Sequence, residues 1–329
     1  MKINMTHGSG GQATSELIRD IFAARLGNSI LSRMEDAAVL QLDSKKGRIA
    51  YTTDSFVVTP LIFKGGDIGR LAVCGTVNDL LAMGAKPLAL SAGFIIEEGM
   101  DTKVLEQIVD SMAMALKEAG TQIVAADTKV IEGRGGLYIN TSGIGYVYEG
   151  VSFGASMLKP GDGLILSGTL GDHHACILSH RMEIENDIES DVAPLNGMVE
   201  ALINHRIRIR AMRDITRGGL ATVLNELCEA SGVSAIIDHK AIPVKETVKG
   251  LCGILGLDPL YMGNEGKMLM AVHPEDTQKA LEIIKNAPYG ESAALIGWVK
   301  EGKGVYQTTE TGSLRTIPVL YGEGLPRIC

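Results

Sequence analysis

The chain has 329 residues, 45% of them hydrophobic, which is enough for two domains with a sizeable core. Its formal net charge of −8 argues against a surface for nucleic acids or anionic membranes, because such surfaces need clustered Lys and Arg, and its aromatic fraction of 4% argues against base stacking. The five cysteines are dispersed and odd in number, and no apolar run approaches about 18 residues, so we expect a soluble cytoplasmic protein.

A glycine-rich loop over residues 7–13 precedes a helix whose apolar positions recur at helical spacing up to Gly27. Such a loop offers free backbone amides, so Gly8, Gly10 and Gly11 are candidates for a flap over phosphates. The letters also match the dinucleotide-binding fingerprint, but the segment before them is too short for the strand which that fingerprint requires. An ordinary chain terminus remains the other interpretation.

Four aspartates fall at the ends of predicted elements: Asp36, Asp54, Asp79 and Asp127. Asp54 ends a half-buried strand, Asp79 lies in the last turns of a helix, and Asp127 ends a buried strand. Each alone is typical of a solvated loop carboxylate. Together they predict hard oxygen ligands for Mg²⁺ bridging the phosphates of a nucleotide. The chain has no P-loop motif, so a nucleotide site here would be of another type.

A turn-rich stretch at 159–163 opens another apolar strand, and we place a domain boundary just before it. This gives an N-terminal domain over residues 1–155, a C-terminal domain over 156–318 and a flexible tail over 319–329. Strands and helices are interspersed through both domains, which predicts an α/β (α+β) protein.

Three motifs in the second domain have two interpretations each. His173 and His174 with Cys176 are possible ligands for zinc or nickel, although their spacing matches no structural zinc pattern and a polar helix start explains the same residues. Arg217 and Gly218 open a helix, which favours either an anion or nucleotide contact or a simple cap. Glu265 stands between two glycines before an apolar strand. Its carboxylate is either open to close approach by a substrate or part of a hairpin turn.

The chain ends in a glycine-containing arm, Gly322-Glu323-Gly324-Leu325-Pro326-Arg327-Ile328-Cys329. Extended from Tyr321, the arm would reach roughly 25 Å at about 3.3 Å per residue, far enough to pass from one domain to another. A disordered terminus that happens to end in cysteine is the alternative. Prenylation does not compete, since its signal needs the cysteine fourth from the end.

Together these motifs resemble the HypE family of [NiFe]-hydrogenase maturation factors, within the aminoimidazole ribonucleotide synthetase and selenophosphate synthetase superfamily. The resemblance covers essentially the whole chain and rests on this ordered set: His7-Gly8-Ser9-Gly10-Gly11, Glu35-Asp36-Ala37-Ala38-Val39, Thr53-Asp54-Ser55-Phe56, Gly66-Asp67-Ile68-Gly69, Asn78-Asp79-Leu80, Asp127-Thr128-Lys129, Gly171-Asp172-His173, Arg213-Asp214-Ile215-Thr216-Arg217-Gly218-Gly219, Asn264-Glu265-Gly266-Lys267 and Pro326-Arg327-Ile328-Cys329. The last of these is specific to the family.

The resemblance implies a homodimer of two-domain protomers with an aminoimidazole ribonucleotide synthetase-like fold. The N-terminal domain would form a dimer barrel and bind ATP and Mg²⁺. The implied activity is ATP-dependent dehydration of an S-carbamoyl group on Cys329 to an S-cyanide, for the cyanide ligands of the hydrogenase iron centre. The implied partners are the carbamoyltransferase HypF and the HypC–HypD complex.

The resemblance also implies roles for single residues. Cys329 is the modified acceptor, Glu265 is the base that deprotonates the amide, with His7 as the second candidate, and Lys129 stabilises the transferred phosphoryl group or the carbamoyl oxygen. The predicted nucleotide contacts are Gly8, Gly10, Gly11, Asp54, Asn78, Asp79, Asp127, Thr128, Arg217 and Gly218, and the predicted metal ligands are Asp36, Asp54, Asp79 and Asp127.

The chain departs from the family pattern at Glu35, Ala126 and His174, and the first two lie close to the expected phosphate site. Two other functions stay open on the residues alone. A related enzyme that phosphorylates a free small amide would turn over without Cys329. A metal chaperone would use His173, His174 and Cys176 and would retain nickel or zinc without ATP.

Overall fold

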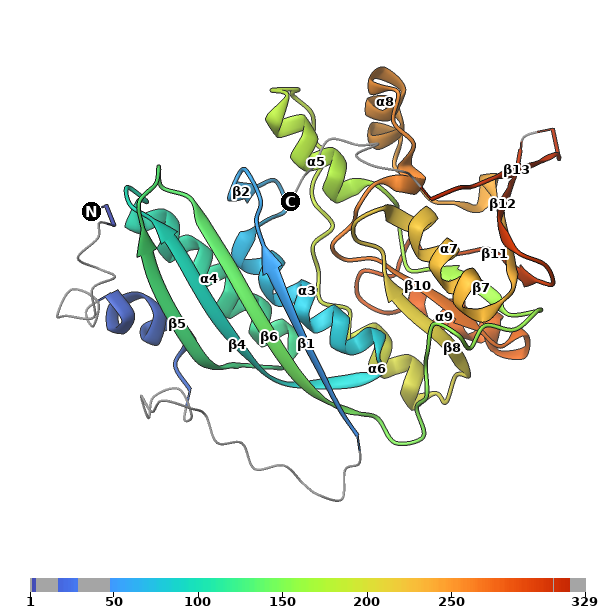
Figure 1. Cartoon of the computed structure of the whole chain (residues 1–329), viewed down its shortest axis with the longest axis horizontal. Coiled ribbons are helices and arrows are strands. Elements are labelled where there is room, and N and C mark those ends of the chain that lie inside the picture. The colour runs from blue at the N-terminus through green and yellow to red at the C-terminus, as the bar shows by residue number, and fades with distance from the viewer. Residues whose placement is uncertain (1, 4–16, 29–47, 310, 320–329) are drawn as a thin grey trace.

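The computed structural model describes residues 2–3, 17–28, 48–309 and 311–319. Two sheet-bearing parts lie side by side in it (Figure 1). The N-terminal part contains η2 (Ile18–Ala23), α2 (Ala24–Leu26), β1 (Ile49–Phe56), β2 (Ile62–Phe63), β3 (Gly66–Asp67), α3 (Ile68–Ala82), β4 (Ala85–Glu97), α4 (Thr102–Ala119), β5 (Ile123–Ile131) and β6 (Leu137–Val147).

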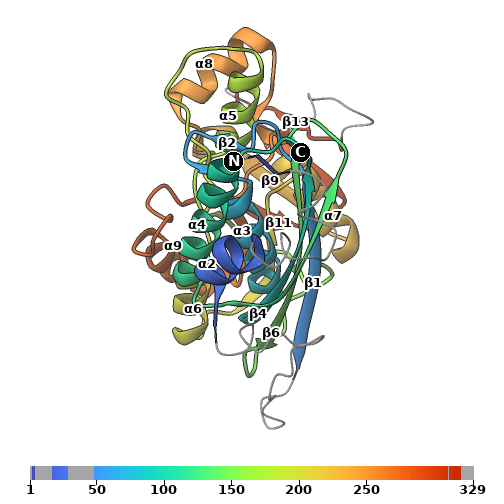
Figure 2. The ribbon, with the colours of Figure 1, turned by 90° about the vertical axis from the view of Figure 1, so that its left-hand side faces the viewer.

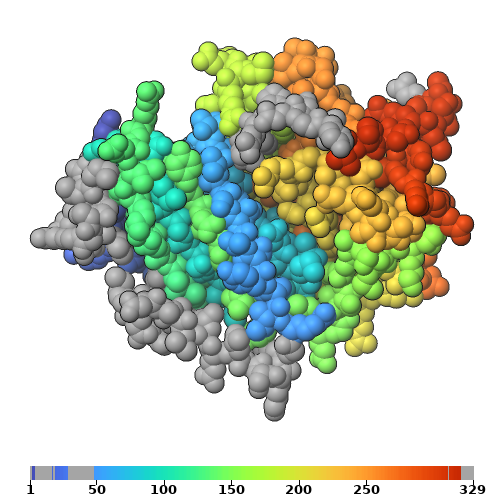
Figure 3. Space-filling model, viewed as in Figure 1, coloured from blue at the N-terminus to red at the C-terminus, as the bar shows by residue number. Residues whose placement is uncertain are grey.

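Four of these strands form one sheet in the order β1-β6-β4-β5, in which only β4 and β5 run parallel. Helices α3 and α4 pack behind it in the view of Figure 1, and Figure 2 shows both helices on the same side of the strands. The opposite face is open, and Tyr51 and Ile95 on it are 71% and 43% exposed. The surface toward the viewer in Figure 3 includes this open face.

The sheet of the N-terminal part stays open within the chain. The resemblance implies a barrel formed by two chains, and the four described strands of one chain do not close into a barrel by themselves. Strand β5 also continues past Asp127 to Ile131, and β1 continues past Asp54 to Phe56, so the prediction that these aspartates end their strands is wrong. The alternation of exposed Lys129 with buried Val130 explains the continuation, because a strand with one open face accepts polar residues at every second position.

The C-terminal part is built on a seven-stranded sheet in the order β13-β12-β9-β11-β7-β10-β8. Its elements are β7 (Gly163–Leu166), α5 (Asp172–Arg181), α6 (Asn196–Asn204), β8 (Ile209–Asp214), α7 (Gly219–Ser231), β9 (Ser234–Asp238), η4 (His239–Ala241), α8 (Glu246–Leu255), η5 (Pro259–Tyr261), β10 (Met268–Val272), η6 (Pro274–Asp276), α9 (Thr277–Lys285), β11 (Ala294–Lys300), β12 (Gly304–Thr308) and β13 (Leu314–Thr316).

Helix α7 packs with one apolar cluster of this sheet, while α6 and α9 belong to another cluster that continues into the N-terminal part. Helices α5 and α8 contact each other and stand together at one end of the molecule (Figures 1 and 2). All residues of β7 and β10 are buried, as expected for strands covered on both faces. The two-part α/β architecture predicted from the sequence is therefore confirmed.

Helix α3 joins the two parts. It packs on the sheet of its own part and also contacts β8 and α6 of the other. Because α3 packs against both parts, little of its surface is left to solvent, and nearly every α3 residue is buried. Asp67 caps its start by accepting hydrogen bonds from the amides of Gly69 and Arg70. The active-site candidates on α3 are therefore held by both parts of the molecule.

Within the described residues, no helix is long and apolar enough to cross a membrane. Four of the five cysteines lie in that portion, and all four are buried and free of disulfide bonds: Cys74, Cys176, Cys228 and Cys252.

Candidate active site

A cavity of about 900 Å³ separates β1 and α3 from β8 and the start of α7. Besides Glu226, which is ion-paired with Arg213, four carboxylates line it: Asp54, Asp79, Asp214 and Glu265. Asp54 comes from β1, Asp79 from the last turn of α3, Asp214 from the end of β8 and Glu265 from the segment just before β10. The side chain of Thr52 donates a hydrogen bond of 2.8 Å to Asp79, which ties α3 to β1 beside the cavity. Four acids from distant segments thus face one space.

The last two of these acids are brought together by strand register. Strand β10 pairs antiparallel with β8, and Met268 lies opposite Asp214. Glu265 precedes Met268 by three residues, so the turn that enters β10 carries it to the same end of the sheet. The backbone N–H of Asn264 donates to the carbonyl of Ile215 at 2.9 Å, which fixes the turn against the segment after β8.

Burial is the main cause of the unusual protonation of these groups. Burial raises the pKa values of Asp54 and Asp79. The negative charge of Asp54 raises the pKa of Asp79 further. Burial raises the pKa of Asp214 to about 6, with a further contribution from Asp79. The pKa of Glu265 is raised well above its usual value by burial first, and then by the charges of Asp191, Asp214 and Asp54. A cluster of acids with raised pKa values is typical of a proton-transfer or cation site.

Cationic side chains line the same cavity. Arg213 and Arg217 line it, and Arg213 forms a 2.9 Å ion pair with Glu226 of α7. Gly218 and Gly219, at the start of α7, both have positive φ angles, +79° and +63°. A Cβ at Gly218 would overlap the hydroxyl of Thr222, so only glycine lets the chain enter the helix here. The start of α7 has no side-chain cap, which leaves amides for an anion.

Asn78 is engaged in a contact between the two parts of the molecule. Its side-chain oxygen accepts from the amide of Leu195 at 3.0 Å, and its NH₂ group donates to the carbonyl of Ala193 at 3.0 Å and that of Glu265 at 3.4 Å. The side chain is buried. This geometry serves the junction and the Glu265 turn, so contact of Asn78 with a nucleotide stays a prediction.

Asp127 and Lys129 lie apart from the cavity of their own chain. They form a 2.9 Å ion pair with each other on β5, the edge strand farthest from β1. Asp127 pairs with Gly93, Gly93 with Asn140, and Asn140 with Ser55, so three strand spacings, about 14 Å, separate this pair from β1. Within one chain, the structure does not bring Asp127, Thr128 and Lys129 to the other candidates.

Several predicted site residues fall outside the described residues: His7, Gly8, Gly10, Gly11, Asp36 and Cys329. Their roles stay predictions.

Asp54 and Asp79 suit a divalent cation. Carboxylate oxygens are the ligands that Mg²⁺ prefers, and a cation would relieve the repulsion by which Asp54 raises the pKa of Asp79. In the portion of the chain that the structure describes, no three His, Cys, Asp or Glu side chains form a group that could hold a metal ion. A Mg²⁺ ion here would therefore take further oxygens from phosphates and water, as this ion commonly does.

Comparison with known proteins agrees with the two-part architecture. Residues 34–147 match the model of the AIR synthase related protein N-terminal domain, and residues 159–308 match that of its C-terminal domain. The carbamoyl dehydratase HypE of Azotobacter vinelandii is 46% identical over 333 residues, covering 99% of this chain and 97% of that protein.

The chain belongs to the HypE family.

Two solved structures extend the comparison. A HypE crystal structure in complex with ATP superposes with a TM-score of 0.94 at 43% identity and covers 99% of each chain. A HypE chain from a HypE–HypF complex gives a TM-score of 0.81 at 48% identity, covering 92% of this chain and 99% of that one. Both likenesses extend over the two parts of the molecule.

The His173, His174 and Cys176 cluster packs as core in this HypE-family chain. Burial lowers the pKa of both imidazoles to about 4, and the ring of His173 lies edge-on to Phe63 at 5.4 Å. The thiol of Cys176 donates to the carbonyl of Lys64. Neutral, packed side chains without a metal-binding arrangement among the described residues give no support to the metal-chaperone reading.

Sequence reasoning missed two acids. Asp214 stands at the end of a half-buried strand, which is the same signal that singles out Asp54. Asp191 lies in a segment between α5 and α6 without regular structure, where neither helical nor strand periodicity provides a signal.

Proposed function

We propose that this chain is the carbamoyl dehydratase of [NiFe]-hydrogenase maturation, which converts S-carbamoyl-Cys329 to an S-cyanide at the expense of ATP. The observation that carries the proposal is the cavity that Glu265 and three aspartates line together with Arg213 and Arg217, in a chain of the HypE family. The ATP complex of a HypE relative supports ATP as the nucleotide.

The reaction needs activation of a poor leaving group. In the first step the carbamoyl oxygen attacks the γ-phosphorus, the bond from that phosphorus to ADP breaks, and the nitrogen gives up one proton. In the second step the nitrogen loses its remaining proton, the C–O bond breaks, and phosphate leaves as the C≡N bond forms. Positioning and charge neutralisation are the usual contributions of a protein to phosphoryl transfer.

Glu265 is the proposed base. Its raised pKa means that the carboxylate, once formed, binds a proton strongly, which suits removal of a proton from a weakly acidic amide. His7 remains the second candidate. Arg217, Gly218 and the start of α7 are proposed to meet the phosphates, together with Gly8, Gly10 and Gly11 from the N-terminal loop.

Asp54 and Asp79 are the described residues proposed to hold Mg²⁺, with Asp36 and Asp127 as further predicted ligands. Mg²⁺, when bound, would neutralise charge on the phosphates.

A homodimer is proposed on two observations. One face of the β1-β6-β4-β5 sheet is open and carries exposed apolar side chains, and the Asp127–Lys129 pair lies on that face, away from its own cavity. We propose that a second copy packs on this face, completes the barrel and brings Asp127, Thr128 and Lys129 toward a nucleotide.

The remaining proposals concern partners and chain organisation. HypF would load the carbamoyl group, as the HypE–HypF complex of a relative supports, and the HypC–HypD complex would receive the cyanide. We propose that residues 1–155 form the domain for ATP binding and dimerisation, residues 156–318 the second domain, and residues 319–329 the tail. The four described cysteines are free, in keeping with the proposed cytoplasmic location.

Intact-mass spectrometry tests the function. After incubation with the carbamoyltransferase system, the protein should gain one carbamoyl group, and Mg-ATP should then remove the mass of one water. We expect Cys329→Ala to take up no carbamoyl group. We expect Glu265→Gln to accept the group and bind ATP, yet to dehydrate it about a hundredfold or more slowly. Wild-type protein that keeps its carbamoyl mass after ATP addition would refute the proposal.

A further inference from the structure

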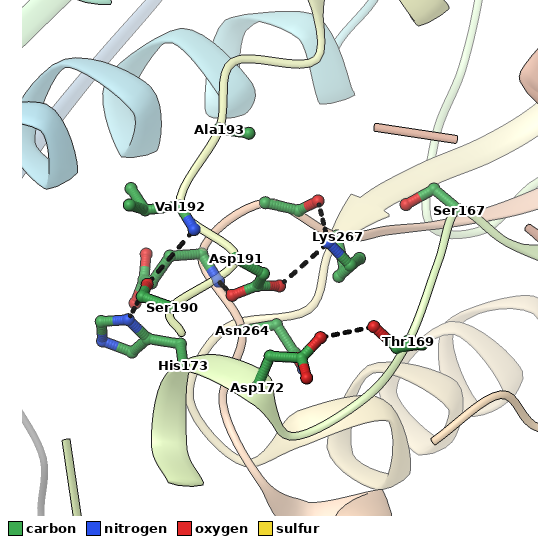
Figure 4. A network of polar contacts seen from close by, with 12 residues as sticks. Ser167, Thr169, Asp172, His173, Ser190, Asp191, Val192, Ala193, Asn264 and Lys267 are labelled. Atoms are coloured by element: carbon green, nitrogen blue, oxygen red, sulfur yellow. Dashed lines mark hydrogen bonds and ion pairs between the residues drawn. The ribbon is translucent and has the colours of Figure 1, made fainter. Parts of the chain in front are cut away.

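An ion pair is buried next to the turn that carries Glu265 into β10 (residues 264–267, the Glu265 turn), on the side away from the active-site cavity. The Nζ of Lys267 lies 3.3 Å from Oδ2 of Asp191, and the side chains of the two residues are 9% and 2% exposed. Figure 4 shows these side chains pointing toward each other from different segments, Asp191 from the chain before α6 and Lys267 from the position just before β10. Burying two charges is costly unless further hydrogen bonds satisfy them, so the remaining contacts of the pair show where it acts.

The pair also forms hydrogen bonds with the backbone on both sides of the Glu265–Gly266 peptide bond. Oδ1 of Asp191 accepts from the backbone N–H of Glu265 at 3.1 Å. Nζ of Lys267 donates to the carbonyl of Gly266 at 3.2 Å. The ion pair closes the arrangement into a ring of charge-assisted contacts, which are stronger than neutral hydrogen bonds.

Gly266 lets the segment of Asp191 lie against this turn. A Cβ at Gly266 would overlap the carbonyl oxygen of Asp191 and would come within 2.9 Å of the amide of Ala193. The carbonyl of Ala193 in turn accepts from Asn78 of α3. The turn is thus held from behind by the C-terminal part and, through Asn78, by the helix that carries Asp79.

We propose that Asp191 and Lys267 are positioning residues for the reaction: they hold the Glu265 turn from behind, so that the carboxylate faces the cavity in a fixed place. This inference rests on the proposed role of Glu265 as the base. Neither Asp191 nor Lys267 lines the cavity that Glu265 faces; both line a second cavity of about 660 Å³ on the other side of the turn.

The charge of Asp191 agrees with this role. After burial, it is the largest cause that raises the pKa of Glu265. The other charged groups that act on Glu265 are Asp214 at the end of β8 and Asp54 on β1, which raise its pKa, and Arg217 before α7, which lowers it. The Asp191 side chain therefore affects Glu265 in two ways: it holds the backbone N–H of Glu265, and its negative charge raises the pKa of the Glu265 carboxyl group.

Two variants separate positioning from general support of the fold. Asp191→Asn keeps an oxygen acceptor for the amide of Glu265 and removes the charge. We expect the pKa of Glu265 to fall, because a neighbouring negative charge is removed, and the acid limb of the dehydration profile to move to lower pH with it. Lys267→Met removes the grip on Gly266, and we expect a tenfold or greater loss of kcat with less than a twofold change in KM for ATP; Lys267→Arg should restore most of the rate.

The matched control is Lys245→Met. Lys245 pairs at 3.3 Å with Asp172, which is also buried beside the second cavity, but it makes no described contact with the Glu265 turn. This variant should leave the acid limb and the kcat unchanged.

The experiment uses the full chain, carbamoylated and supplied with Mg-ATP, and follows single-turnover loss of water against pH. The titration of Glu265 is measured separately by carboxyl ¹³C NMR, with the signal assigned by Glu265→Gln. If Asp191→Asn leaves this titration unchanged, or if Lys267→Met loses stability but keeps its kcat, the positioning role is refuted. A wild-type protein that does not dehydrate its carbamoyl group would refute the proposed function instead, and the NMR titration would still decide the effect of Asp191 on Glu265.

Discussion

Asp214 shows how burial of an acid couples the cavity to pH. Its pKa in the folded chain is about 6, against 3.8 for an ordinary aspartate. An acid whose pKa is higher in the folded chain stabilises the fold fully below its unfolded value, and this contribution is lost as pH rises through the folded value. Between about pH 4 and pH 6, ionisation of Asp214 therefore works against folding.

Asp214→Asn should remove this effect. At about pH 7 we expect a free energy of unfolding about 1–3 kcal/mol higher than that of the wild type, and near pH 4 we expect the difference to vanish. Denaturant unfolding at the two pH values measures it. Asp187→Asn, at a fully exposed side chain, should stay within about 0.5 kcal/mol at both. An Asp214→Asn advantage that is the same at both pH values would contradict the pKa assignment.

The sequence predicts which single residues are candidates for the site better than it predicts which of them lie together. Asp54, Asp79, Arg217 and Glu265 meet in one cavity as expected. Asp127 carried the same signal as Asp54 but lies on the opposite face of the sheet, because neighbouring strand positions alternate between faces and strand order is not visible in local periodicity.

The turn before β10 is the element on which the site depends. Gly266 has no room for a side chain, since a Cβ would overlap the carbonyl of Asp191. Hairpin geometry and access for a substrate were both open interpretations of this glycine-flanked glutamate. The structure adds a third reason for Gly266, close packing by a distant segment, which no local pattern could reveal.

Gly266→Ala should displace the turn. We expect a loss of about 2 kcal/mol or more in unfolding free energy, as for overpacking of a core, and a dehydration rate at least tenfold lower because Glu265 moves with its neighbour. Unfolding curves and single-turnover rates measure the two effects.

The control is Gly250→Ala in α8, where a Cβ meets nothing within 4 Å. This substitution should stabilise the protein by up to about 1 kcal/mol and leave the rate unchanged, because alanine is the better helix former. Equal behaviour of the two alanine variants would contradict the close packing at Gly266.

For the whole molecule, the open sheet face is the feature that a single chain does not explain. The sequence correctly predicted two α/β parts, because helical and strand periodicities are local. It predicted a barrel only through resemblance, and closing one requires strands that this chain does not supply among its described residues. The proposed dimer accounts for both the exposed apolar residues and the remote Asp127–Lys129 pair.

Ile95→Glu, on the inner strand β4 of the open face, should weaken that dimer. A charge buried at the interface costs more than about 1.4 kcal/mol, so we expect the dimer Kd to rise at least tenfold and dehydration to fall with it. Analytical ultracentrifugation gives the Kd. Ile254→Glu, on α8 at 80% exposure, should leave both unchanged. A wild-type protein that sediments as a monomer at all concentrations would refute the dimer.

The central claim is that ATP phosphorylates the carbamoyl oxygen on Cys329, and the fate of that oxygen tests it most directly. The carbamoyl group is introduced with a heavy oxygen isotope, Mg-ATP is added, and the released phosphate is analysed by mass spectrometry. The account predicts one heavy oxygen in each phosphate released, together with loss of heavy water mass from the protein. Heavy oxygen recovered in solvent water, with unlabelled phosphate, would contradict it.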